Sequence, residues 1–137
     1  MKVYLSRGKS FVGSILAGTS ASTTAVKMWF GRKAAKGWAT CPMVQAGFVR
    51  IASNPVFSPR AVSPKEALDV LASNTRHPAH QFWPDHMSLA DGLVNLQRRI
   101  VGREQLTDAY LHAPAIYHRD RLASLDKGLL GLLKASN

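Results

Sequence analysis

Short apolar runs alternate along this chain with helix-start signals, and this alternation is the feature that most restricts its fold. "WATC" (38–41) is typical of a short buried strand, and Pro42 suits the first position of a helix that we expect to end near Ala52. Three further strands are expected at Val3–Leu5, at "HQFW" (80–83) and at "RLASL" (121–125).

The segment "SPKEALDVLA" predicts a second helix with a well-defined start. Ser63 can cap this helix, Pro64 fits its first turn, and Glu66 completes a capping box. The apolar side chains expected to face inward are those at positions 67, 68, 70 and 71.

Three more helices are expected from apolar spacing. One runs from about Thr23 to Ala35. Another is capped by Ser88 and carries a stripe of Leu89, Leu93, Leu96 and Ile100. The last starts at Asp108 and contains Pro114, which should kink it. Helices that alternate with short strands indicate an α/β protein whose short parallel sheet is covered by helices. At 137 residues, the chain fits one domain.

The charge is distributed unevenly. Residues 1–65 contain ten Lys or Arg and no Asp or Glu, whereas residues 66–137 contain eight of each kind. The whole net charge of +10 therefore lies in the first half. A basic half suggests a polyanionic partner such as nucleic acid, or an acidic protein, although solvated lysines on helix faces would look the same.

The single cysteine, Cys41, excludes an internal disulfide and fits a reducing cytoplasm. No apolar run approaches the roughly 20 residues that span a bilayer.

Two aspartates stand at the ends of adjacent predicted elements. A helix from Asp108 to about Arg119 descends roughly 16 Å. A strand from Arg121 to Asp126 climbs back by a similar distance. Both carboxylates should therefore reach one edge of the sheet, where ligand crevices form. Gln45, in the first turn after "WATC", should reach the same edge.

Two carboxylates and a neutral oxygen form a set suited to Mg²⁺ or Mn²⁺, and such an ion could activate water at a phosphodiester. The alternative is ordinary helix and turn chemistry for both aspartates. His77, His80 and His86 with Asp85 could also be drawn as a zinc cluster, but the intervening prolines favour a loop around a strand. Cys41 is interpreted as a core residue rather than a catalytic thiol.

Six blocks resemble a known family: "GWATCP", "GFVRIASNP", "SPKEALDVL", "HPAHQFWPD", "QLTDAYL" and "LASLDKGL". In this order and spacing, over about residues 25–133, they are similar to the PIN-domain ribonuclease toxins of the VapC type. The resemblance implies a three-layer α/β/α sandwich, Mg²⁺-dependent cleavage of RNA, a cognate antitoxin and frequent dimerisation. It implies that Asp108 and Asp126 bind the metal, and it places Gln45 where many relatives have Glu.

The amino-terminal strand departs from the family pattern. Relatives begin with a strand of the type Leu-Leu-Asp-x-Asn, and sliding that pattern back without gaps places its Asp on Gly8. Residues 6–24 are atypical and rich in Ser and Gly. A locally shifted reading frame there would explain this departure and the lack of acids in the amino half, a hypothesis that fails if no single-base shift in the gene restores the pattern. Without this carboxylate, the resemblance implies weakened metal binding.

The sequence therefore predicts a metal-dependent endoribonuclease toxin, impaired by loss of the first-strand Asp. Asp108 and Asp126 are expected to hold Mg²⁺, Gln45 to orient a water or phosphate, and Arg50, Arg103 and Arg119 to contact RNA. Two alternatives remain: an inactive PIN remnant that binds antitoxin or RNA, and a general basic nucleic-acid binder.

Overall fold

The computed structural model describes residues 3–6, 37–56, 60–96, 98, 100, 102, 105–119 and 121–124, with the backbone alone at 3–6, 105, 108 and 121–124. The predicted helix at 23–35, nearly all of the segment 6–24, and Gly8, Arg103 and Asp126 lie outside the described residues. The apolar run at residues 129–133 also lies outside them.

Four short strands form one sheet in the order β3-β2-β1-β4. They are β1 (Val3–Ser6), β2 (Trp38–Thr40), β3 (His80–Phe82) and β4 (Arg121–Ser124), so all four strands predicted from the sequence are present. β2 and β3 are parallel, with Trp38 opposite His80 and Thr40 opposite Phe82. The helices α2 (Pro42–Ala52) and α3 (Pro64–Thr75) connect these two strands, as a parallel crossover requires.

The expectation of a parallel sheet is correct for β2 and β3 but wrong for β1. This strand runs antiparallel to β2, with Leu5 opposite Ala39, and antiparallel to β4 from Val3–Ser124 to Ser6–Arg121. Apolar periodicity identifies a strand but carries no information about its direction, which depends on the path of the connecting chain. The described sheet is therefore mixed, and the chain is an α/β protein.

The start of α3 forms as its sequence predicts. The Ser63 backbone N–H donates to Glu66 Oε2 at 2.8 Å, and the Glu66 N–H donates to Ser63 Oγ at 3.2 Å, which completes the capping box. The Ser63 hydroxyl also donates to Glu66 Oε2, at 2.7 Å, and this bond, together with the one from the Ser63 N–H, lowers the pKa of Glu66. α2 also has the predicted limits, with Pro42 in its first turn.

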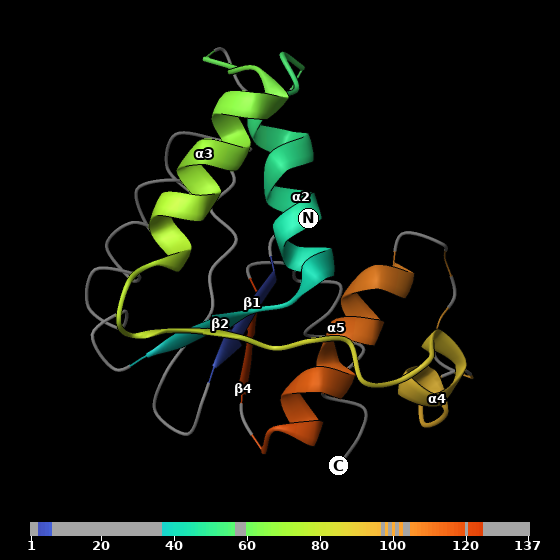
Figure 1. Cartoon of the computed structure of the whole chain (residues 1–137). Helices are drawn as coiled ribbons and strands as arrows, with labels where there is room; N and C mark the ends of the chain where they lie inside the picture. Colours follow the sequence, from blue (N-terminus) through green and yellow to red (C-terminus); the bar gives the residue numbers. More distant parts are fainter. Residues whose placement is uncertain are drawn as a thin grey trace.

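The inward face predicted for α3 is correct for Ala67 and for the half-buried Leu71, but wrong for the other two positions. Ala67 is buried, but Leu68 and Val70 keep 53% and 47% of their surface exposed. The apolar spacing correctly indicated a helix, yet α3 packs mainly on α2 and touches the edge strand β3, so few of its side chains meet the sheet. Figure 1 shows α2 and α3 side by side, projecting from the strands.

The last two described helices are α4 (Leu89–Leu93) and α5 (Gln105–Tyr117). Ser88 caps α4 as predicted, accepting from the Asp91 N–H at 3.1 Å, but Leu89 of the expected stripe remains 45% exposed. α5 begins before Asp108 rather than at it, and it runs through Pro114. It packs on β1, β4 and α4.

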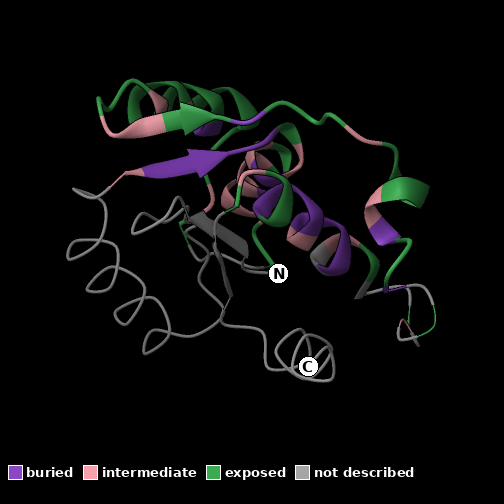
Figure 2. Cartoon of the chain, turned by 90° about the horizontal axis from the view of Figure 1, so that it is seen from below, coloured by how far each residue is buried: buried purple, intermediate pink, exposed green. Residues whose placement is uncertain are grey.

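The described core consists of two adjoining clusters. The first joins β2 and α2 to the middle of α5, and its members are Trp38, Ala39, Cys41, Val44, Trp83, Leu111 and Ala115. The second joins α4 to α5 through Leu93, Leu96, Ala109 and Tyr110. Met43, in the first turn of α2, packs against both clusters. Figure 2 shows buried residues along β2, whereas the edge strand β3 is more exposed. In the part of the chain with described structure, no helix has the length and hydrophobicity needed to cross a membrane.

Candidate active site

A hydrogen-bonded chain joins three elements at the carboxyl end of β2. Gln45 Nε2 donates to Thr40 Oγ1 at 2.8 Å, and Thr40 Oγ1 is also 2.8 Å from Nε2 of His80. Thr40 is the last residue of β2, and only 3% of its surface is exposed. Gln45 lies in the first turn of α2, and His80 is the first residue of β3. Gln45 thus lies at the sheet edge where the sequence predicts it, and its amide is held by a buried hydroxyl.

The start of α2 lies at the same edge and has no side-chain cap. Cys41 precedes the helix with an extended backbone (φ −110°, ψ 168°), and the first turn contains no acid. Burial raises the pKa of the Cys41 thiol, and the nearby Asp85 carboxylate acts in the same direction. A thiol held in its protonated form is a poor nucleophile, which supports the interpretation of Cys41 as a core residue.

Asp108 lies on the part of α5 that faces this region of the fold. It is the fourth residue of α5. The two residues after it, Ala109 and Tyr110, are buried in the cluster against which Met43 packs. Since Met43 and Gln45 share the first turns of α2, the packing brings the helix that carries Asp108 to the start of α2. The side chain of Asp108 is not among those described.

The structure gives partial placements for the other predicted site residues. β4 runs back along the sheet after α5, as the down-and-up excursion requires, but Asp126 lies beyond the described end of this strand. Arg50 is exposed in the last turn of α2, away from Gln45. Arg119 is exposed just after the end of α5 opposite to Asp108, with a left-handed φ of 52°. Neither arginine is gathered at the start of α2.

Asp85 is a further acid at this edge that the sequence did not single out for the site. The Trp83 N–H donates to Thr40 O at 2.8 Å, and the Tyr110 hydroxyl donates to Met87 O at 3.0 Å. The segment that contains Asp85 is therefore tied to β2 on one side and to α5 on the other. Burial raises the pKa of Tyr110, and the charge of Asp85 raises it further.

Thr40 and His80 were likewise not predicted as site residues. Thr40 ends β2 and Asp85 follows β3, so the rule that the carboxyl ends of parallel strands meet at one sheet edge would have identified both, whereas His80 begins β3. Among the described residues, no group of three His, Cys, Asp or Glu side chains could hold a metal ion. His80 is bonded to Thr40, and the Nδ1 of His77 accepts from the Ala79 N–H at 3.1 Å. The magnesium site expected from Asp108 and Asp126 stays a prediction.

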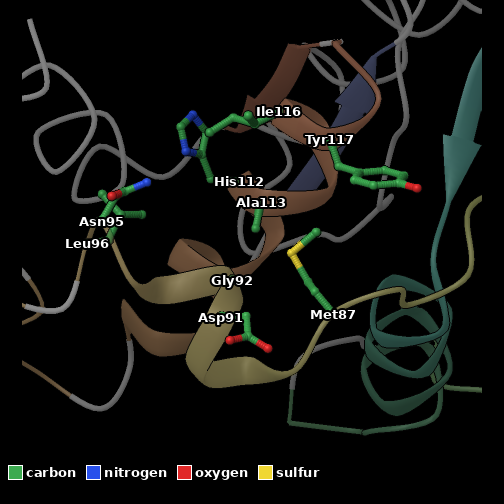
Figure 3. A pocket seen from close by; sticks show the side chains of 9 residues that line it. All are labelled: Met87, Asp91, Gly92, Asn95, Leu96, His112, Ala113, Ile116 and Tyr117. Atoms are coloured by element: carbon green, nitrogen blue, oxygen red, sulfur yellow. The ribbon is translucent and has the colours of Figure 1, made fainter.

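A separate pocket of about 440 Å³ lies between α4 and α5. Figure 3 shows its side chains, which include Asp91 and Asn95 from the α4 side and His112 and Ile116 from α5. Burial lowers the pKa of His112. None of the residues predicted for the active site lines this pocket.

Comparison with known proteins shows the family. The chain is 40% identical over 107 residues to ribonuclease VapC38 of Mycobacterium tuberculosis (strain ATCC 25618 / H37Rv), which covers 78% of this chain and 74% of that protein. It is 36% identical over 103 residues to ribonuclease VapC44 (75% and 72%) and 34% identical over 105 residues to ribonuclease VapC39 (77% and 76%), both from strain CDC 1551 / Oshkosh of that bacterium. No family model matches the chain. The six sequence blocks and these identities together show that the chain belongs to the VapC-type family of PIN-domain ribonuclease toxins.

Proposed function

We propose that this protein is an endoribonuclease toxin whose cleavage of RNA depends on Mg²⁺ or Mn²⁺, and that a cognate antitoxin inhibits it. The observation that carries the proposal is the packing of α5 against the start of α2 through Met43, which brings the helix of Asp108 to the turn of Gln45. The relatives named as ribonucleases, at 34 to 40% identity, support the same reaction.

The donor types suit a hard cation. Asp108 and Asp126 would hold the ion, and the neutral amide of Gln45 would orient a water or a phosphate. The bound ion would lower the pKa of its water and offset charge on the phosphodiester. The excess of basic residues would draw the RNA backbone, and Arg50, Arg103 and Arg119 are the proposed contacts.

Activity is proposed to be impaired. Gly8 stands where the family pattern has an aspartate, and glycine offers no side chain to bind a metal. The acid-free first 65 residues contain no other carboxylate that could substitute for it. This observation favours a second candidate function, an inactive PIN remnant that binds antitoxin or RNA without cutting. Asp85, at the edge shared by β2 and α5, is the described carboxylate best placed to compensate.

We also propose the finer family properties for this chain. The described mixed sheet and its helices would form part of a three-layer α/β/α sandwich, the protein would act in the cytoplasm, and it would dimerise. Sedimentation of the purified protein tests the dimer independently of catalysis.

The test of function compares Asp108→Asn with Asp69→Asn. Asp69 is a matched control, because it is a helical aspartate on the exposed α3, paired with Lys65 at 2.7 Å. Cleavage of a defined RNA with Mg²⁺ or Mn²⁺ should fall at least tenfold in Asp108→Asn and stay unchanged in Asp69→Asn. Equal cleavage by both variants would show that the nuclease assignment to this site is wrong. Absence of cleavage by the parent protein, together with metal-independent RNA binding, would favour the binding-only function.

A further inference from the structure

The chain of hydrogen bonds from His80 through Thr40 to Gln45 crosses β3, β2 and α2. Thr40 is almost fully buried, and His80 is partly buried against the Trp38 ring, with 4.5 Å between ring centroids. A buried hydroxyl with two partners has a defined direction for its single proton. That direction fixes which atom of Gln45 can face it.

The direction follows from the state of His80. Burial lowers the pKa of His80, so that the ring is neutral near pH 7, with one N–H and one acceptor nitrogen. The backbone of Thr75 acts in the opposite direction and favours a ring N–H, and we assign this N–H to Nδ1 because Nε2 lies 2.8 Å from Thr40 Oγ1. Nε2, which faces Thr40, is then the acceptor, and the Thr40 hydroxyl donates to it. Only lone pairs of Thr40 Oγ1 remain for Gln45, and they accept from its amide NH₂ group.

We propose that Thr40 and His80 are positioning residues that hold the Gln45 amide with NH₂ toward the sheet and leave its carbonyl oxygen as the acceptor for a metal-bound water. The proposal rests on the proposed function. It explains why such support is needed in this chain. A glutamate, which many relatives have at this place, offers an acceptor oxygen on either branch of its carboxylate, whereas a glutamine offers one only when its amide is turned correctly.

The orientation can be measured without metal or RNA. In ¹⁵N-labelled protein, the Gln45 side-chain amide should give two well-separated proton resonances that exchange slowly with solvent. Thr40→Val removes the hydroxyl while keeping the branched shape, and it should abolish this slow exchange. Thr40→Ser restores a hydroxyl and should recover it. Circular dichroism shows whether each variant is folded.

The consequence for the site is measured by Mn²⁺ binding. Thr40→Val should weaken Mn²⁺ binding about tenfold, as loss of a group that orients a metal site typically does. Thr40→Ser should bind within about twofold of the parent protein. His80→Phe, at a partly exposed position, frees the Thr40 hydroxyl to turn and should give about threefold weakening. This variant keeps the test open if Thr40→Val does not fold.

A double-mutant comparison separates positioning from general damage. In a Gln45→Ala background, Thr40→Val should cause no further loss of Mn²⁺ affinity, because the group that it positions is absent. An undiminished loss in that background would overturn the proposal. It would also be overturned if Asp108→Asn abolished Mn²⁺ binding while Thr40→Val left it unchanged, although the proposed function would survive. A parent protein that does not bind Mn²⁺ would overturn both.

Discussion

Gly92 is the position in the described structure where one added methyl group has the most predictable cost. A Cβ built on Gly92 would lie 2.9 Å from Cδ2 and 3.0 Å from Cε2 of Tyr110, and 3.3 Å from Cβ of Ala113. The tyrosine ring cannot easily withdraw, because it is 97% buried (3% exposed) and its hydroxyl donates to Met87 O at 3.0 Å. Gly92→Ala therefore forces α4 away from α5 or breaks that hydrogen bond.

Two opposing terms set the size of the effect. Alanine is favoured over glycine inside a helix by up to about 1 kcal/mol. Inserting a methyl group into a close-packed contact costs about 1–3 kcal/mol. The overlap with a fixed aromatic ring puts the cost near the upper part of that range, so Gly92→Ala should lower the free energy of unfolding by about 1–2 kcal/mol. In a domain of this size, each kcal/mol lowers Tm by about 3–5 °C.

Calorimetry or chemical denaturation of Gly92→Ala and Gly102→Ala provides the assay. Gly102 is the matched control, because a Cβ there would meet no atom within 4 Å. Its alanine variant should be neutral or slightly more stable. In a Tyr110→Leu background, the loss of unfolding free energy caused by Gly92→Ala should be smaller by about 1 kcal/mol, because the two residues are in contact. A Tm for Gly92→Ala that equals or exceeds that of Gly102→Ala would refute the reasoning.

Two further predictions concern the core and its dependence on pH. Leu111→Ala, at a side chain with no exposed surface, should lower the free energy of unfolding by about 2–5 kcal/mol in urea titration, and a cost below about 1 kcal/mol would place Leu111 outside the core. Burial lowers the pKa of both His80 and His112 below the usual 6.5. As the pH falls, the two histidines therefore become protonated in the unfolded chain before they do so in the folded protein. Stability should hold above pH 6.5 and fall as pH drops through the window between 6.5 and the lower folded pKa values. Urea midpoints at pH 7.5, 6.5 and 5.5 measure this loss, which should be smaller in a His80→Gln/His112→Gln variant; equal midpoints in the parent protein would contradict it.

Local signals in the sequence predicted the starts of α2, α3 and α4. Pro42 after a buried strand, and Ser63 with Glu66 three residues later, specify helix ends through hydrogen bonds within one turn. Nothing local determines which side of a finished helix meets another element. Leu68 and Val70 have helical spacing, but they face outward because α3 packs mainly on α2. The sequence prediction also missed the direction of β1, because that direction depends on the path of the chain between the strands and not on the residues of the strand itself.

The candidate site was predictable where chain order alone determines position. Gln45 follows β2 by a few residues, so that its place at the sheet edge required no knowledge of the rest of the fold. The bond between Thr40 and His80 joins residues 40 apart in sequence, and only the pairing of β2 with β3 brings them together. Asp85 follows the end of β3 and could have been identified by the same rule, whereas the hydrogen bond from the Tyr110 hydroxyl to Met87 O, which fixes this segment against α5, could not.

The contact of Met43 with both core clusters has a consequence for genetic screens of this protein. A substitution in either cluster displaces the same helical turn, and that turn carries Gln45. Loss-of-toxicity mutations should therefore scatter over interior positions on β2, α4 and α5 as well as over the site itself. For each such variant, the fraction of folded protein must be measured before the substituted residue is assigned a role in the reaction.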